Sequence, residues 1–343
     1  MKKHVPYWII ILFFASFCSV IVWYNIAKPR VLVLHSYDAN YPWSRDVTVG
    51  INRVLSKKTY AIRWYYMDAK RHPGKESKES AGKGARALID NWRPDVVIAV
   101  DDDAQEYVAK KYADRKDIKI VFAGLNGGHD LYGYDKATNV TGILERKWYP
   151  AMKHAILTIH QSDGKRAPVR VMNISDNSES VQKDEIFLKA FDWSPVVLME
   201  SRLVKTMDEW KLAVKDANAK ADFIITDNYR KLLLDAGKKV LMKPGDVIKW
   251  TMANTTIPII GTNGFIVEDG GMLAIATSPF EQGEVAAGMA VQIIDKKVAP
   301  KDIPVVSTKQ FVVYMNKKKL NERGITMPGI YEAFARATNN YFE

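Results

Sequence analysis

Short apolar runs alternate with amphipathic segments along the chain from residue 30 to residue 315. Unbroken apolar runs are typical of buried strands in a parallel sheet, and apolar positions every three to four residues are typical of helices. The expected strands are 30–35, 60–67, 96–100, 119–123, 140–144, 169–174, 196–204, 222–226, 257–260, 272–276 and 311–315. The expected helices are 47–55, 77–92, 104 onward, 148–159, 180–191, 207–219, 232–242 with an extension past Pro244 to 252, and 279–294. This alternation predicts parallel sheets with right-handed crossovers.

The strand–helix pattern starts again after residue 144, which predicts two α/β lobes of similar plan. The expected fold class is therefore α/β, with two doubly wound α/β/α lobes joined by a hinge. We expect residues 31–143 plus 280–305 to form the first lobe and 144–279 plus 306–330 to form the second. Residues 331–343 are expected to form a short amphipathic tail. A ligand held between the lobes would contact the loops at the strand ends of both.

Residues 5–27 carry no charge, and as a helix they would extend about 34 Å, enough to cross a bilayer. Residues 1–29 are therefore predicted to be a membrane anchor or signal segment. Lys2 and Lys3 favour a cytoplasmic amino terminus, and Trp23 and Tyr24 suit the outer interface. The folded part would then lie in the periplasm or the extracellular space, on a single-pass protein of the cell inner membrane.

Two other fates of this segment stay open. A cleaved signal peptide would release the protein into the periplasm, although a small-x-small cleavage site is hard to find. Lipidation of Cys18 is the other, but Phe17 precedes it where a bacterial lipoprotein signal has a small residue. Because Cys18 is the single cysteine, the folded part can form no intramolecular disulfide.

Composition and motifs argue against several classes of function. The 343 residues are 47% hydrophobic and 26% charged, which is the balance of a globular protein. The net charge of +11 is spread along the chain without a Lys/Arg block interleaved with aromatic residues, so we expect no nucleic-acid binding. The six histidines are scattered and no phosphate-binding or G-x-S-x-G motif occurs, so we expect no metal, no cofactor and no enzymatic activity.

Polar side chains recur where the expected strands end, and ligands of open α/β sheets bind at the carboxyl ends of strands. Asp101, Asp102 and Asp103 follow the strand 96–100 directly. Asn and Asp are also favoured in turns and at helix starts, so each position has a purely structural alternative. The candidate ligand-binding residues are Ser36, Tyr37, Trp43, Asp101, Asp102, Asn126, Asp176, Asn177, Asp227, Asn228, Asn263 and Glu281.

The acidic strand ends also suggest the charge of the ligand. No Lys or Arg occurs at residues 35–44, 101–106 or 124–128, so carboxylates facing a closing cleft would repel one another unless a cation enters. We therefore expect a small ligand with a protonated amine or several N–H donors, amino-acid-like or nucleobase-like, stacked on Tyr37 or Trp43.

The motifs resemble those of a known family. They are VLVLHSYDANYPW (31–43), PDVVIAVDDDA (94–104), IVFAGLN (120–126), NVTGILE (139–145), GGMLAIATSPFEQGEVAAGMAVQII (270–294) and DIPV (302–305). Over about residues 30–330 the chain resembles the solute-binding proteins of ABC transporters with the type 1 periplasmic-binding fold. The branch it is most similar to includes proposed tryptophan and tyrosine binders and sensor domains of histidine kinases and diguanylate cyclases.

This resemblance implies a binding protein that closes two lobes around a small molecule and serves an ABC permease. The alternative it implies is a ligand-sensing subunit or domain that signals to a membrane histidine kinase or diguanylate cyclase. Sensor members usually continue into a second membrane segment and an output domain, whereas this sequence stops at Glu343. We therefore expect an anchored, stand-alone binding domain, with transport and signalling both open.

Overall fold

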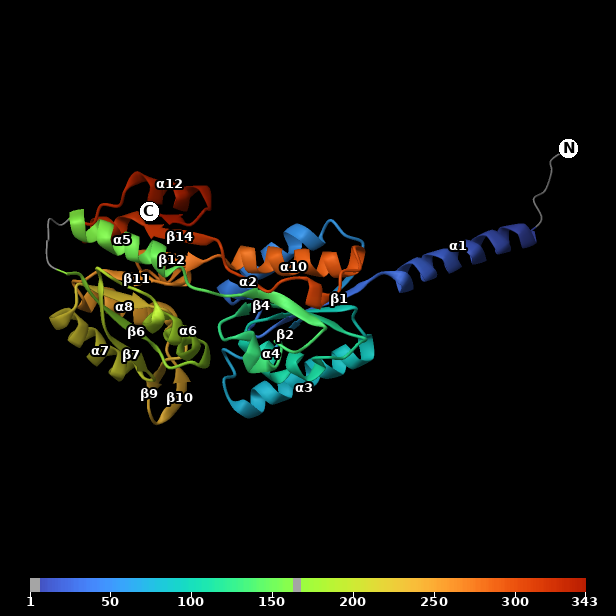
Figure 1. The fold of residues 1–343 in the computed structure, drawn as a ribbon, viewed down its shortest axis with the longest axis horizontal. Helices are drawn as coiled ribbons and strands as arrows, with labels where there is room; N and C mark the ends of the chain where they lie inside the picture. Colours follow the sequence, from blue (N-terminus) through green and yellow to red (C-terminus); the bar gives the residue numbers. More distant parts are fainter. Residues whose placement is uncertain (1–6, 163–167) are drawn as a thin grey trace.

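The computed structural model describes residues 7–162 and 168–343, and Figure 1 shows two α/β lobes joined side by side with one helix projecting from the far end of the first lobe. Lys2, Lys3 and the first two residues of the expected membrane segment lie outside the described residues. The fold class predicted from the sequence is confirmed, because both lobes contain a largely parallel sheet with helices packed on it.

The projecting helix is α1, Tyr7–Ala27, with 21 residues and no buried side chain. Its mean hydropathy and length are sufficient to cross a membrane, and a signal sequence would pass the same test. Either role explains why so many large apolar side chains are exposed on this helix.

The first lobe contains a six-stranded, wholly parallel sheet in the order β13-β5-β4-β3-β1-β2. Its central strand β3 is buried along its whole length, as its unbroken apolar run predicts. The strands are β1 (Arg30–His35), β2 (Ala61–Tyr66), β3 (Val96–Val100), β4 (Lys119–Leu125), β5 (Val140–Leu144) and β13 (Val306–Ser307). The helices are α2 (Pro42–Leu55), α3 (Lys75–Trp92), α4 (Asp102–Tyr107), α10 (Pro279–Asp295) and the short 3-10 helices η1 (Ala109–Tyr112), η2 (His129–Tyr132) and η3 (Pro300–Asp302).

The second lobe contains a seven-stranded sheet in the order β15-β14-β12-β11-β8-β6-β7, in which β14 runs antiparallel to β12. Its strands are β6 (Arg170–Asp176), β7 (Val197–Val204), β8 (Phe223–Thr226), β11 (Ile259–Gly261), β12 (Leu273–Thr277), β14 (Phe311–Asn316) and β15 (Tyr341–Phe342). Its helices are α5 (Tyr149–Ser162), α6 (Glu179–Ala190), α7 (Met207–Lys220), α8 (Pro244–Asn254), α9 (Phe265–Glu268), α11 (Lys317–Asn321) and α12 (Gly329–Ala337).

The chain crosses between the sheets three times, from β5 to α5, from β12 to α10 and from β13 to β14. Figure 1 shows these crossings as short segments between the lobes. Because each lobe has its own hydrophobic core, the crossings are where one lobe can turn relative to the other.

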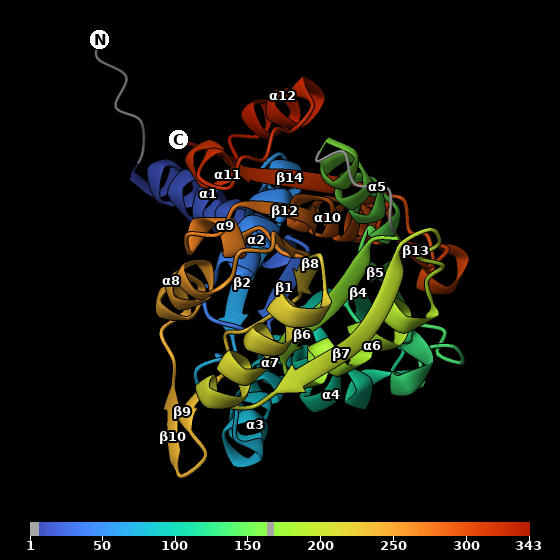
Figure 2. The same cartoon turned by 90° about the vertical axis from the view of Figure 1, so that its left-hand side faces the viewer.

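One expected helix is wrong. Residues 232–242 form a hairpin of β9 (Leu233–Asp235) and β10 (Lys238–Leu241), which projects from the second lobe in Figure 2, and the helix is α8, beginning at Pro244. The reason lies in the turn, where the Asp235 carboxylate accepts a hydrogen bond from the Gly237 amide at 2.8 Å. Asp and Gly favour a tight turn, and this preference outweighs the apolar residues that suggested a helix.

Two smaller assignments also differ. Residues 306 and 307, expected in the second lobe, form β13 and pair with β5 in the first. Residues 331–343, expected as a tail, contain most of α12 and β15, with Tyr331 and Ala335 buried in the core of the second lobe. Both segments are too short for a periodic pattern to show their pairing.

Candidate functional site

A polar pocket lies at the carboxyl ends of the strands, where the two lobes meet. Its free volume is only about 30 Å³, so the side chains of the two lobes nearly fill it. The pocket is lined by Tyr37, Tyr41, Trp43, Lys70, Asp101, Asn126, Glu145, Lys147, Ser180, Asp184, Asp227, Asn228, Asn263 and Phe265. Residues from the first lobe, the second lobe and the crossing after β5 all contribute.

Asp101 is the carboxylate that the first lobe places in the pocket. It follows β3 in a left-handed conformation with φ of 68°, and its side chain is 2% exposed. The indole nitrogen of Trp43 donates a hydrogen bond to Oδ1 at 2.8 Å, whereas Oδ2 has no partner among the described residues. Burial, together with the negative charges of Glu145 and Asp102, raises the pKa of Asp101 well above its usual range. Oδ2 is therefore free to bond a ligand, and a positively charged N–H group beside it would favour the ionised carboxylate.

Aromatic rings form one wall. The rings of Tyr37 and Tyr41 pack edge to face with centroids 5.0 Å apart, and Phe265 of the second lobe lies 6.4 Å from Tyr41. The buried ammonium of Lys70 lies 4.6 Å from the Tyr37 ring centroid and 5.7 Å from that of Tyr41. This wall offers flat faces and a fixed positive charge to a ligand.

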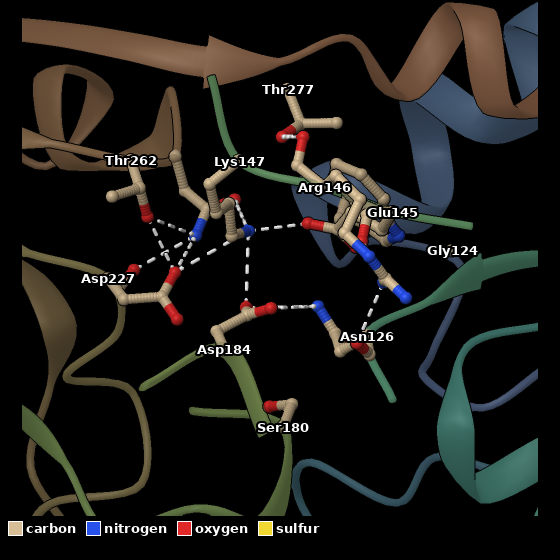
Figure 3. Close-up of polar contacts among 12 residues, drawn as sticks. Gly124, Asn126, Glu145, Arg146, Lys147, Ser180, Asp184, Asp227, Thr262 and Thr277 are labelled. Atoms are coloured by element: carbon tan, nitrogen blue, oxygen red, sulfur yellow. Dashed lines mark hydrogen bonds and ion pairs between the residues drawn. The ribbon is translucent and has the colours of Figure 1, made fainter. Parts of the chain in front are cut away.

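Lys147 lies at the centre of the acidic part, on the crossing from β5 to α5 (Figure 3). Its side chain is 4% exposed and forms an ion pair with Glu145, while Asp227 lies 3.5 Å away and Asp184 3.6 Å away. Burial opposes the charge of Lys147, but the charges of Asp227, Glu145 and Asp184 outweigh it and raise its pKa well above the usual value.

The two carboxylates that the second lobe places near Lys147, Asp184 and Asp227, differ in proton affinity. Burial and repulsion by Asp227 and Glu145 raise the pKa of Asp184 well above its usual range, although Lys147 opposes this shift. Burial also opposes the charge of Asp227, yet Lys147 and a hydrogen bond from Thr262 at 2.6 Å lower its pKa. Asp227 is therefore the ionised partner of Lys147, and Asp184 holds a proton more readily.

The sequence predicts a positively charged ligand on the assumption that no protein cation lies near the carboxylates at the strand ends. This assumption is wrong, because other carboxylates at the strand ends are paired with lysines of the protein. Asp102 accepts a hydrogen bond at 2.7 Å from Lys183, which lies on α6 of the second lobe. Asp103 pairs with the buried ammonium of Lys78 at 2.7 Å. These lysines come from helices and could not be placed at the strand ends from the sequence. Most of the acidic turn therefore needs no ligand to neutralise it.

Seven of the predicted residues line the pocket together, namely Tyr37, Trp43, Asp101, Asn126, Asp227, Asn228 and Asn263. Ser36 instead donates to the carbonyl of Val100 at 2.8 Å and accepts from the Ala104 amide at 2.7 Å, which fixes the turn after β3. Glu281 accepts from the amides of Lys309 and Gln310 and so joins α10 to the third crossing.

The remaining predicted residues also have local partners outside the pocket lining. Asp176 accepts from the amides of Ser178 and Lys231 at 3.0 and 2.9 Å, and Asn177 accepts from the side chain of Gln182 at 2.7 Å. Asp102 joins the two lobes, as described above. For these positions the structural alternative explains the observed contacts.

The prediction omitted Tyr41, Lys70, Glu145, Lys147, Ser180, Asp184 and Phe265. Glu145 and Lys147 could have been found from the sequence, because Glu-Arg-Lys directly follows an apolar strand where the chain leaves the first lobe. Asp184 lies within a helix, where the spacing did not show which side faces the pocket. Among the described residues, no three His, Cys, Asp or Glu side chains are grouped to hold a metal ion.

Comparison with known proteins decides the family. The family model described as ABC transporter substrate binding protein matches residues 38–338, which is most of the chain. The chain belongs to this family. The resemblance noted from the sequence motifs is thereby confirmed.

Solved structures support the same fold. A domain from Streptococcus pneumoniae in complex with L-Trp has a TM-score of 0.65 at 20% identity, covering 89% of this chain and 98% of that one. A conserved domain protein from Vibrio cholerae has a TM-score of 0.65 at 16% identity, covering 92% of this chain and all of that one. The ligand-free, open substrate-binding protein with adhesive properties from Clostridium difficile has a TM-score of 0.62 at 15% identity, covering 88% and 96%.

A curated sequence relative is an uncharacterized protein of Rickettsia prowazekii, 25% identical over 154 residues. This match covers 44% of the present chain and 47% of the relative, so it spans about half the length of each. Membership of the substrate-binding family supports the binding of a small-molecule ligand by this chain.

Proposed function

We propose that this protein is an extracytoplasmic, membrane-anchored solute-binding protein that closes its two lobes around a small polar ligand for ABC-type uptake. The observation that carries the proposal is the pocket itself, where charged and aromatic side chains of both lobes meet around Lys147. Burying so many polar groups costs free energy, so such a site is kept for a function rather than for stability. No chemical step is proposed, only binding and hinge closure.

The lining also suggests a ligand class. We propose a ligand with an amine or N–H donor for Asp101 Oδ2 and a flat portion for the Tyr37 and Tyr41 rings. Lys70 would suit an anionic group on the same molecule, so an amino-acid-like zwitterion fits better than a simple cation. The L-Trp complex of the Streptococcus pneumoniae domain is consistent with this class. Because the free volume is about 30 Å³, the lobes must separate before such a ligand enters.

The division into lobes follows from this proposal. We place the first lobe at residues 30–144 plus 279–307 and the second at 149–277 plus 311–343, with the crossings between them acting as the hinge. Closure would bring Asp101 and Tyr37 of the first lobe toward Asp184 and Asp227 of the second.

Sensing is the second candidate function. The fold is also similar to that in the ligand-free complex of the TorS sensor domain with TorT, with a TM-score of 0.52 at 11% identity, covering 88% of this chain and 97% of that one. A binding protein of this fold could therefore present its closed form to a membrane histidine kinase or diguanylate cyclase. Genes for a permease and an ATPase beside this gene would favour uptake, and a kinase or cyclase gene would favour sensing.

Thermal unfolding tests the binding proposal. The full chain in detergent is heated with each member of a panel of amino acids, nucleosides and organic acids. A true ligand at 100 times its Kd should stabilise the protein by about 2.7 kcal/mol. Asp227→Asn should reduce the affinity for that ligand about tenfold or more, because the ionised partner of Lys147 is lost.

Asn177→Ala is the matched control, because Asn177 contacts Gln182 rather than the pocket. The control should bind like the wild type. A panel in which no compound raises the unfolding temperature, or an Asp227→Asn variant with unchanged affinity, would count against this pocket as the binding site.

A further inference from the structure

The end of the first lobe that faces α1 is built from the loops that precede its parallel strands. In register, Arg30 pairs with Ala61 and Val96 pairs with Lys119, so β1, β2, β3 and β4 all start at this edge. The carboxyl end of α10 lies here too, because Lys58 and Tyr60 both bond Asp295. This edge is opposite to the strand ends that form the pocket.

We define the basic rim as residues 28–30, 56–60, 93–95, 113–119 and 295–298, the segments that meet at this edge. The rim contains ten Lys or Arg and four Asp, a difference of +6. Without Lys2 and Lys3, the chain has 48 of its 50 Lys and Arg against 39 Asp and Glu, a difference of +9. Two thirds of the net charge of residues 7–343 is thus concentrated in five short segments.

Most acidic side chains of the basic rim already have a partner within the protein. Asp295 pairs with Lys58 at 2.8 Å, Asp117 pairs with Arg115 at 2.6 Å, and Asp95 accepts from the Arg30 amide at 2.8 Å. In the described part of the chain, several exposed basic side chains of the rim have no ion pair. They are Lys57, Arg93, Lys116, Lys296 and Lys297.

Helix dipoles explain only part of this pattern. Cations are favoured at helix carboxyl ends, which accounts for Lys57 after α2, Arg93 after α3 and Lys296 after α10. Lys116 and Lys119 lie before and at the start of β4 instead, where no α-helix dipole requires them. A second influence is needed for the rim as a whole.

The chain length between α1 and β1 identifies what the rim faces. Only Lys28 and Pro29 separate Ala27 from Arg30, so the three Cα–Cα steps from Ala27 to Arg30 extend at most about 11 Å. A bilayer has a headgroup layer of about 5–7 Å on each side of its hydrocarbon core. If α1 spans the core, the start of β1 therefore lies within or just outside the headgroup layer, and its distance from that layer is shorter than the Debye length of about 8 Å at physiological salt.

We propose that the basic rim binds the anionic headgroups of the bilayer that α1 crosses, so that the first lobe rests on the membrane and the second lobe moves. This proposal rests on the membrane anchorage in the proposed function. Figure 1 shows α1 leaving the end of the first lobe that is far from the second lobe. The pocket edge then faces away from the lipid, which leaves the cleft open to solutes.

Lipid quenching in vesicles tests the proposal with the full chain. A dye is attached at Thr59→Cys in the rim or at the exposed Leu212→Cys on α7, both in a Cys18→Ala background. The protein is reconstituted into phosphatidylcholine vesicles, with or without a quarter of phosphatidylglycerol, containing headgroup quenchers. We expect stronger quenching at position 59 with phosphatidylglycerol, reversed by 1 M salt, and little quenching at position 212 in either vesicle.

Charge variants separate lipid binding from net charge. Neutralising four rim lysines should lower the phosphatidylglycerol-dependent quenching at position 59 by at least about half. Neutralising four exposed lysines of the second lobe should leave it unchanged. The rim variant carries Lys57→Gln, Lys116→Gln, Lys296→Gln and Lys297→Gln, and the control carries Lys205→Gln, Lys215→Gln, Lys249→Gln and Lys318→Gln.

The outcomes distinguish this proposal from the one it rests on. Equal quenching at position 59 in both vesicles, or equal loss in the two lysine variants, would overturn the rim proposal while the ligand-dependent thermal shift stands. A chain that carbonate extracts from the membrane would overturn the anchor and the rim together.

Discussion

Asp101 is a carboxylate whose ionisation the fold opposes. Burial is the main cause, and the neighbouring charges of Glu145 and Asp102 add to it, so its pKa lies well above the usual range. A carboxyl group with a folded pKa above its unfolded pKa contributes full stability below about pH 3.9 and loses it as the pH rises through the folded pKa. The neutral variant Asp101→Asn keeps an acceptor for the Trp43 indole without this loss.

The free energy of unfolding of Asp101→Asn, relative to wild type, should therefore increase as the pH rises above about 4. The increase should be about 1.4 kcal/mol for each unit by which the folded pKa exceeds the unfolded one. Urea unfolding between pH 4 and pH 9 measures it. Asp208→Asn, on a side chain that is 75% exposed, is the control and should show no such trend. A pH-independent difference for Asp101→Asn would mean that its pKa is not raised.

At this scale the sequence predicts the side chains at strand ends better than those on helices and loops. Asp101, Asn126 and Asp227 could be placed because each directly follows an apolar run whose end is visible in the sequence. Lys70 and Asp184 could not, because their contacts depend on how separate segments come together. Ser36 was rightly placed at a strand end, but its hydroxyl is used by the backbone of the turn.

Helices α2 and α10 of the first lobe cross at two glycines, and this crossing is the element-scale feature most sensitive to substitution. A Cβ on Gly283 would lie 2.2 Å from the Val47 carbonyl oxygen and 2.7 Å from the Ile51 nitrogen. A Cβ on Gly50 would lie 2.2 Å from the Phe280 carbonyl oxygen. Since these neighbours are backbone atoms, the helices themselves must move apart to admit a methyl group.

Gly283→Ala should therefore destabilise the protein by about 1–3 kcal/mol through overpacking. Gly288→Ala, on the same helix, meets no atom within 4 Å and should stabilise the protein by about 0.5–1 kcal/mol, because alanine favours the helix. Urea denaturation of both variants measures the contrast. A Gly283→Ala protein as stable as Gly288→Ala would show that the crossing can relax at little cost.

The strand and helix pattern failed where local turn chemistry opposed it. Residues 232–242 were expected to be helical, yet Asp235 and Gly237 form the turn of the β9–β10 hairpin. The amide of Met242 bonds the carbonyl of Leu232 at 2.8 Å, which closes the hairpin at its base. By contrast, the buried strands of both sheets were predictable from their apolar runs.

For the whole molecule, the repeat of the strand–helix pattern was sufficient to predict two lobes, since each sheet needs helices on its faces. The return crossings were harder to place. Strand β13 has only two residues, too few for a pattern that would indicate its pairing with β5. The contacts between the lobes depend on side chains from both and could not be predicted from either half alone.

We expect one of these contacts to favour the closed form over the open form. Lys183 on α6 donates to Asp102 and to the Tyr132 hydroxyl, both at 2.7 Å, and so ties the second lobe to the first. Its side chain is 26% exposed, so the pair contributes on the order of 1 kcal/mol to the closed form. Lys183→Met removes the ion pair and should shift the open–closed equilibrium of the ligand-free protein toward the open form by about fivefold.

Energy transfer between dyes on the two lobes, in the Cys18→Ala background, measures this shift. The Kd of any ligand that binds the closed form should rise by up to the same factor, because fewer molecules are closed beforehand. Lys189→Met is the matched control, since Lys189 lies on the same helix and pairs only with Glu185 at 3.0 Å within its own lobe. If Lys183→Met and Lys189→Met give the same energy transfer, closure does not depend on this ion pair, and the lobes are held together by the contacts around Lys147 instead.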